Sequence, residues 1–194
     1  MNETSPKVIV IAGPNGAGKT TLSPFLLRDE LGLLEYVNAD PIAHGLSGFD
    51  PASVALQAGR VMLNRLHELA EQRKTFAFET TLASKHYAGW IKKLRDERYA
   101  FQLIFLWLRS PDLAVQRVRA RLHAGGHDVP EEVIRRGHAA GLRNFWDFYQ
   151  PLADAWAVYD NSESEKSLIA AGDREVPVLI HDQRSWMSFS LTKP

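Results

Sequence analysis

Residues 7–21 read KVIVIAGPNGAGKTT, and this stretch decides the fold. The apolar run at residues 8–11 has the composition of a buried strand, and a glycine-rich turn follows that ends in Gly18, Lys19 and Thr20. The spacing is G-x-x-x-x-G-K-[ST] in the order strand, loop, helix, which predicts a phosphate-binding loop. The competing interpretation is a glycine-rich turn that only caps a helix.

Each residue type in this loop suits phosphate binding. Glycines let backbone N–H groups point inward at a phosphate, and the helix N-terminus adds partial positive charge. We expect Lys19 to reach the outer phosphates and the Thr20 hydroxyl to bind Mg²⁺, so ATP and Mg²⁺ are the expected cofactors. The residues expected to bind the nucleotide are Gly13, Pro14, Asn15, Gly16, Ala17, Gly18, Lys19, Thr20 and Thr21.

Composition limits the remaining choices. The 194 residues fit one domain, 1–194, with a full hydrophobic core. Because 23 acidic and 23 basic residues balance, the overall charge favours neither nucleic acid nor a membrane as partner. The absence of cysteine excludes disulfides, a thiol nucleophile and a thiolate metal site. The polar start MNETSPK and the lack of a run near the roughly 20 apolar residues of a membrane span predict a soluble cytoplasmic protein.

Strand and helix patterns alternate along the chain. Strands are expected at residues 8–11, 34–40, 74–80, 100–108 and 155–159. Helices are expected at 21–29, 53–73, 84–98, 111–123 and 130–148, with a loop at 124–129 and a C-terminal hairpin of 168–170 and 176–180 within an extension at about 162–194. This order predicts an α/β three-layer sandwich, a P-loop NTPase fold with about five parallel strands.

Two carboxylates lie at the ends of predicted strands. Asp40 closes the second strand and Glu79 lies near the end of the third. Ligands bind at the carboxyl ends of parallel strands, so we expect Glu79 to hold Mg²⁺ with Thr20 and Asp40 to deprotonate an acceptor hydroxyl. Two alternatives remain: Asp40 caps the turn after Pro41, or Glu79 is a satisfied acid at the rim of the sheet.

A basic cluster follows the fourth strand, on two successive helices: Arg117, Arg119, Arg121, Arg135 and Arg136. Arg117 and Arg121 share one helix face, and Arg119 points away from it. We expect residues 117–136 to form a helical lid in which Arg117, Arg121 and Arg135 contact the transferring phosphoryl group. The alternative is a solvated basic face paired with Glu131 and Glu132.

Four motifs together resemble a known family. GPNGAGKTT, VNAD, FAFETT and AVQRVRARLHAGGHDVPEEVIRR are similar to segments of the short zeta-toxin-like P-loop kinases, also described as predicted ABC-type ATPases. The resemblance covers residues 7–162. It implies an ATP-dependent kinase that phosphorylates the sugar of UDP-N-acetylglucosamine and has an antitoxin partner that blocks the ATP site. By motif, Lys19 and Thr20 match the ATP and Mg²⁺ contacts, Asp40 the base, Glu79 the third-strand acid and Arg117 the first lid arginine.

Two positions depart from the family pattern. His127 stands where the long toxins have a second lid arginine, a place that Arg135 or Arg136 would fill instead. Residues 82–84 stand where those toxins have a sugar-binding arginine, for which Lys85 would compensate. The residues expected to bind the acceptor are Glu79, Thr80, Thr81, Lys85 and Tyr87.

Other functions fit the same motifs. A kinase of this fold could act on a nucleoside, an antibiotic or another sugar. The sequence LSGF at residues 46–49 faintly resembles the ABC signature LSGGQ, which would indicate an ATPase switch, but phenylalanine stands in place of a glycine and we interpret the segment as a loop.

Overall fold

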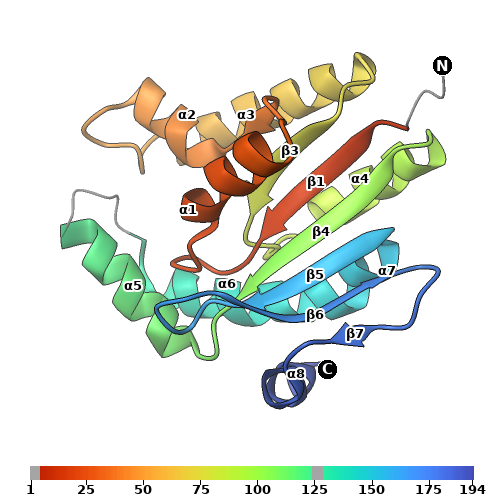
Figure 1. The fold of residues 1–194 in the computed structure, drawn as a ribbon. Coiled ribbons are helices and arrows are strands. Elements are labelled where there is room, and N and C mark those ends of the chain that lie inside the picture. Colours follow the sequence, from red (N-terminus) through yellow and green to blue (C-terminus); the bar gives the residue numbers. More distant parts are fainter. Residues whose placement is uncertain (1–4, 124–128) are drawn as a thin grey trace.

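The structure is a computed structural model that describes residues 5–123 and 129–194. Its centre is a seven-stranded sheet in the order β2-β3-β1-β4-β5-β6-β7 (Figure 1). The strands are β1 (Lys7–Ala12), β2 (Tyr36–Val37), β3 (Phe76–Thr80), β4 (Ala100–Trp107), β5 (Ala155–Asp160), β6 (Ser167–Asp173) and β7 (Leu179–Ile180). The first five strands in this order, from β2 to β5, pair in parallel with their neighbours. Strand β6 is antiparallel to β5, and β7 is antiparallel to β6. The predicted α/β fold with a parallel sheet is confirmed.

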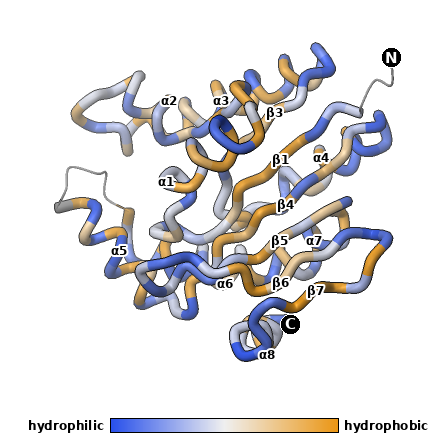
Figure 2. Tube along the Cα trace, viewed as in Figure 1, coloured by the Kyte–Doolittle hydropathy of each residue, from blue (hydrophilic) through white to orange (hydrophobic). Residues whose placement is uncertain are grey.

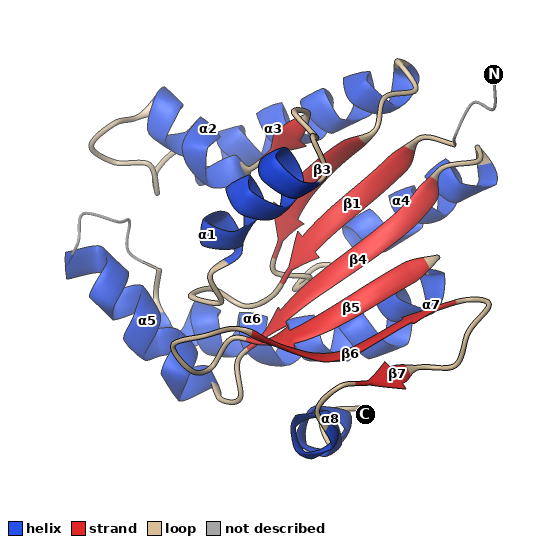
Figure 3. Ribbon diagram, viewed as in Figure 1, coloured by secondary structure: helices blue, strands red, loops and turns tan. Residues whose placement is uncertain are grey.

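Helices cover both faces of the sheet (Figure 3). They are α1 (Lys19–Ser23), η1 (Pro24–Glu30), α2 (Ala39–Leu46), α3 (Ala55–Glu71), α4 (His86–Asp96), α5 (Pro111–His123), α6 (Glu131–Asn144), η2 (Phe145–Tyr149), α7 (Gln150–Leu152) and α8 (Gln183–Ser190). Two of these, η1 and η2, are π-helical continuations of α1 and α6.

The core forms because side chains of a strand alternate between the two faces. Val8 and Val10 of β1 join a large cluster with α3 and α4, whereas Ile9 and Ile11 pack with η1 on the other face. Figure 2 shows the corresponding run of hydrophobic residues along β1. A central strand that is buried on both faces fixes the loop after it, which carries the glycine-rich motif.

The second strand is shorter than expected. It spans only Tyr36–Val37, and α2 begins two residues later. The Asn38 side chain accepts the backbone N–H of Asp40 at 2.9 Å and so caps α2. Pro41 lies in the first turn, where its missing N–H costs no helical bond. The expectation that Asp40 ends a strand was therefore wrong, because it lies in the first turn of α2.

The C-terminal segment contains a helix that the sequence pattern did not predict. Asp182 caps α8 by accepting the backbone N–H groups of Arg184 and Ser185 at 3.0 and 3.1 Å. Phe189 of α8 is fully buried against Phe105 and Phe145. The predicted helix at 130–148 ends at Asn144 and continues as η2. Among the described residues, no helix has both the length and the apolar character needed to cross a membrane.

Candidate functional site

The loop between β1 and α1 has the geometry of a phosphate cradle. Gly13 and Gly18 have φ angles of 144° and 82°, which L side chains rarely adopt. A Cβ on Gly13 would also lie 2.3 Å from the carbonyl oxygen of Leu106. The Lys19 ammonium donates to the carbonyl oxygens of Gly13 and Pro14 at 2.9 and 3.0 Å, so it lies across the loop. The residues present therefore fit a bound phosphate chain.

The charge of Lys19 depends on its surroundings. Burial lowers the pKa of the Lys19 ammonium from its usual value, and the carboxylates of Glu79 and Asp40 oppose that shift. Arg121 adds a smaller lowering effect on the same pKa. Two cations and two carboxylates thus act on one another at the end of the loop, where an anionic ligand would join them.

Glu79 is a buried carboxylate, with 8% of its surface exposed, and three hydroxyl groups donate to it. Thr20 donates to Oε2 at 3.0 Å, Ser23 to Oε1 at 2.6 Å, and Tyr36 also donates to Oε1. The three hydroxyl donors satisfy the carboxylate oxygens in a place where an unpaired buried polar group would be costly. Thr20 and Glu79, the two expected Mg²⁺ residues, are therefore in direct contact.

Tyr36 connects this carboxylate to the Asp40 segment, and the sequence interpretation missed it. Burial, and then its bond to Glu79, raise the pKa of the Tyr36 hydroxyl, so the hydroxyl stays protonated. The same hydroxyl accepts the Asn38 side-chain amide at 3.1 Å, and Asn38 in turn holds the backbone N–H of Asp40 at 2.9 Å. The signal was the spacing Tyr36-x-Asn38, which places both side chains on one face of an extended segment.

A cavity of about 290 Å³ brings the central predicted residues together. It is lined by Asn15, Gly16, Gly18, Lys19, Thr20, Thr21, Asp40, Glu79, Arg117 and Arg121. The Asp40 side chain is exposed to solvent, whereas Glu79 is buried behind Thr20. An exposed carboxylate facing a phosphate-binding loop can accept a proton from a bound hydroxyl, and a buried one is better suited to a fixed supporting role.

Four residues expected to bind the acceptor lie outside the lining of this cavity. Thr80 and Thr81 accept backbone N–H groups within their own loop, at 3.1 and 3.3 Å. The Lys85 ammonium lies 4.5 Å from the centre of the Phe148 ring. Tyr87 packs on Phe78, with ring centres 4.9 Å apart, because this side of α4 faces the sheet. Their predicted role in acceptor binding has no support from these positions.

The predicted lid arginines occupy different places. Arg121 lines the 290 Å³ cavity. Arg135 forms ion pairs with Asp112 and Glu131 at 2.7 and 2.8 Å, away from the cavity lining. His127 lies outside the described residues. Arg121 and Arg117 both line the cavity with Asp40, and the role of Arg121 at the transferring phosphoryl group stays a prediction.

Arg117 lies at the junction with a second, larger cavity. The second cavity has a volume of about 740 Å³ and is lined by Gly18, Thr21, Leu22, Phe25, Leu106, Arg117, Asn161, Glu163, Ser164, Glu165 and Lys166. Gly18, Thr21 and Arg117 line both cavities. The sequence interpretation missed the wall at 161–166, because those residues carry no motif.

A divalent cation would find few protein ligands here. Within residues 5–123 and 129–194, no group of three or more His, Asp or Glu side chains is arranged to hold a metal. Mg²⁺ keeps several waters and binds through one or two protein oxygens together with substrate phosphates. The Thr20 hydroxyl, backed by Glu79, fits that pattern.

Comparison with known proteins places the chain among P-loop proteins. Residues 8–141 match the profile of the AAA_33 family, described as an AAA domain. An uncharacterized protein of Haemophilus influenzae is 26% identical over 129 residues, which cover 66% of this chain and 90% of that protein.

Two solved structures share the fold. The AvrRxo1-ORF1:-ORF2 complex with ATP matches with a TM-score of 0.75 and 17% identity over 100% of this chain and 65% of the matched chain. The PezAT chromosomal toxin–antitoxin system of Streptococcus pneumoniae matches with a TM-score of 0.63 and 17% identity, over 86% of this chain and 72% of the matched chain. This chain therefore spans about two thirds of the AvrRxo1 chain that it matches.

Proposed function

The chain belongs to the AAA_33 family of AAA domains, and on this premise we propose that it is an ATP-dependent phosphotransferase acting on a hydroxyl of a small molecule. The observation that carries the proposal is the single cavity that Lys19, Thr20, Asp40 and Arg121 line together. Phosphoryl transfer needs little covalent chemistry from the protein, but it needs cations at the phosphates and a carboxylate at the acceptor. The cavity holds both.

Each residue has a role in this proposal. Lys19 and the loop N–H groups hold the outer phosphates, and Thr20 with Glu79 behind it holds Mg²⁺. Bound ATP supplies the phosphoryl group, and Mg²⁺ neutralises part of its charge. Asp40 orients the acceptor hydroxyl and takes its proton, and Arg121 stabilises the negative charge of the transferring group.

We further propose UDP-N-acetylglucosamine as the acceptor and a toxin–antitoxin pair as the setting. The sequence motifs that resemble zeta-toxin-like kinases support this proposal. So does the fold shared with a chain of the PezAT toxin–antitoxin system and with a chain of the two-component AvrRxo1 complex. A protein antitoxin would then be the partner.

One observation favours a second candidate, a kinase of the same chemistry with a different acceptor. Lys85, expected to replace the sugar-binding arginine, lies over Phe148 and outside the cavity lining. A diphosphate-bearing acceptor needs a cation near it, and without Lys85 that cation has to be Arg121 or one supplied on binding. A nucleoside, an aminoglycoside or a free sugar would need none.

The test is transfer of labelled γ-phosphate from ATP to a panel of UDP-sugars, nucleosides, free sugars and aminoglycosides. The Lys19→Ala variant, which lacks the loop cation, serves as the blank for contaminating kinases. Acceptor-dependent transfer that the blank lacks supports a phosphotransferase, and the reacting compound identifies the acceptor. Hydrolysis of ATP at the same rate with and without every acceptor would contradict the proposal and favour an ATPase switch.

A further inference from the structure

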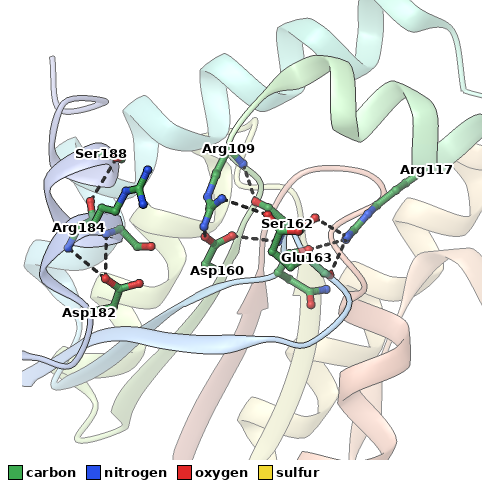
Figure 4. Close-up of polar contacts among 10 residues, drawn as sticks. Arg109, Arg117, Asp160, Ser162, Glu163, Asp182, Arg184 and Ser188 are labelled. Carbon is green, nitrogen blue, oxygen red and sulfur yellow. Dashed lines mark hydrogen bonds and ion pairs between the residues drawn. The ribbon is translucent and has the colours of Figure 1, made fainter.

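The Arg117 guanidinium is engaged by backbone carbonyls rather than by a charged group. It donates to the carbonyl oxygens of Asn161 at 2.6 Å, Ser162 at 3.0 Å and Glu163 at 3.1 Å (Figure 4). Two of these three residues, Asn161 and Glu163, line the 740 Å³ cavity together with residues 164–166, and we refer to residues 161–166 as its wall. A planar fork with several N–H groups can reach all three acceptors from one position, and the compact ammonium of lysine is less suited to that.

The same wall is attached to the phosphate-binding loop. The Asn161 side-chain amide donates to the carbonyl oxygen of Ala17 at 2.8 Å. A Cβ on Gly18 would lie 2.7 Å from that amide nitrogen, so the contact needs glycine there. A Cβ on Gly16 would lie 3.1 Å from Arg117 Cβ, which shows how closely α5 approaches the loop. The phosphate-binding loop therefore contacts both α5 and the wall, and Arg117 makes the contact between α5 and the wall.

A second arginine holds the wall from the other side, as Figure 4 shows. Arg109 forms an ion pair with Asp160 at 2.7 Å, and Asp160 is only 2% exposed. Asp160 also accepts the backbone N–H of Ser162 at 2.9 Å, and the Ser162 hydroxyl accepts the backbone N–H of Arg109 at 3.0 Å. Arg109 also forms an exposed ion pair with the Glu163 side chain at 3.1 Å, so it holds side chains of the wall, whereas Arg117 holds the backbone carbonyls of residues 161–163.

We propose that Arg117 is a positioning residue that holds residues 161–166 as the wall of a nucleoside pocket and thereby sets the affinity and base selectivity for the nucleotide. The proposal rests on the nucleotide binding assumed in the proposed function. It assigns phosphate contact to Arg121 and reassigns Arg117, which the motif resemblance had placed at the transferring phosphoryl group.

Two features favour this assignment over a direct phosphate contact. Moving the guanidinium to a phosphate would leave three carbonyl oxygens without their donors, and charge-assisted bonds are among the stronger hydrogen bonds. Arg121, one turn further along α5, already lines the smaller cavity with Lys19 and Asp40. The larger cavity adjoins the loop through Gly18 and Thr21, and its lining includes Phe25, an exposed aromatic side chain that a nucleobase could contact.

The test is calorimetric titration with Mg²⁺ and the non-hydrolysable analogues AMP-PNP and GMP-PNP, without acceptor. Arg117→Ala is expected to raise the AMP-PNP Kd by tenfold or more, about 1.4 kcal/mol, and to reduce the preference between the two bases. Arg117→Lys keeps the charge but not the fork, so it should also weaken AMP-PNP binding. Arg119→Ala, which removes an exposed ion pair to Glu131 at 2.6 Å, is the matched control and should bind as the wild type does.

The outcomes separate this proposal from the proposed function. Thermal melts that match the wild type show that each variant is folded, and Arg117→Lys serves if Arg117→Ala is not. A Kd within threefold of the wild type for both analogues in the folded Arg117 variants would overturn the proposal, even if phosphate transfer occurs. Full rescue by Arg117→Lys would also overturn it, because charge alone would then suffice. Weakened binding with a reduced preference between the two bases would support it even if the wild type phosphorylates none of the tested acceptors, whereas equal weakening for both analogues would indicate a direct phosphate contact and overturn it.

Discussion

Replacing Tyr36 by phenylalanine removes one hydroxyl that makes two hydrogen bonds. The hydroxyl donates to Glu79 and accepts the amide of Asn38, the residue that caps α2 beside Asp40. After the change, Glu79 keeps the Thr20 and Ser23 hydroxyls as donors, at 3.0 and 2.6 Å. The variant therefore weakens the connection between Glu79 and the proposed base, Asp40, and leaves the other hydrogen bonds to Glu79 in place.

The size of the effect follows from these contacts. A hydrogen bond to a charged group contributes about 1.5–3 kcal/mol, and the half-buried position of Tyr36 points to about 2 kcal/mol of unfolding free energy. For a chain of this length each kcal/mol shifts Tm by about 2–4 °C, so we expect Tm to fall by about 4–8 °C. Phosphate transfer should fall about tenfold, because the cap that orients Asp40 loses its partner.

The assay pairs thermal unfolding with a transfer rate at saturating ATP. Tyr87→Phe is the matched control, since it makes the same chemical change at a hydroxyl whose contact is the Met62 sulfur at 4.0 Å. The control should change Tm by little and leave transfer intact. Equal Tm and equal transfer in Tyr36→Phe and Tyr87→Phe would refute the proposed link through Tyr36.

Two further predictions concern the loop and the core. Gly13→Ala should destabilise the fold by several kcal/mol and abolish AMP-PNP binding, because its Cβ would lie 2.3 Å from a backbone oxygen. Gly59→Ala in α3 is the control: a Cβ there meets nothing within 4 Å, so the change should stabilise the helix by about 1 kcal/mol. Urea unfolding measures the free energy of unfolding of both variants, and an equal change in the two would contradict the close packing inferred for the phosphate-binding loop. Burial lowers the pKa of His138, whose Nε2 lies 2.9 Å from the Leu108 carbonyl oxygen. As the pH falls, the unfolded chain therefore takes up a proton at this residue before the folded chain does, and the stability that is present above about pH 6.5 is lost below it. Between pH 8 and pH 5.5, urea unfolding should show a smaller loss of unfolding free energy in His138→Gln than in the wild type. An identical loss in the two proteins would disprove the role of His138.

The sequence was sufficient where local pattern decides structure. The strand, glycine-rich loop and helix at residues 7–23 follow from residue type and spacing, and the alternation of patterns predicted the α/β sheet. The i, i+4 spacing also placed Arg117 and Arg121 on one face, and both line the 290 Å³ cavity.

The sequence was insufficient where distant backbone groups decide. Arg117 bonds to carbonyls 44 to 46 residues away, and no side-chain pattern marks a carbonyl as an acceptor. Helix α2 was missed because its cap, Asn38, was counted as part of a strand. Lys85 was expected in the cleft by its nearness in sequence to Glu79, but its ammonium lies over the ring of Phe148, a residue far along the chain that the local sequence does not point to.

The central claim is that Asp40 acts on an acceptor hydroxyl rather than on the nucleotide. The direct measurement compares Asp40→Asn with the wild type for AMP-PNP affinity and for phosphate transfer to the best acceptor. The account predicts an affinity within a few-fold of the wild type and transfer reduced by about a hundredfold or more, the usual contribution of a positioned base. Transfer at the wild-type rate would contradict it, and so would a collapse of AMP-PNP affinity, which would make Asp40 a metal ligand or a structural residue of α2.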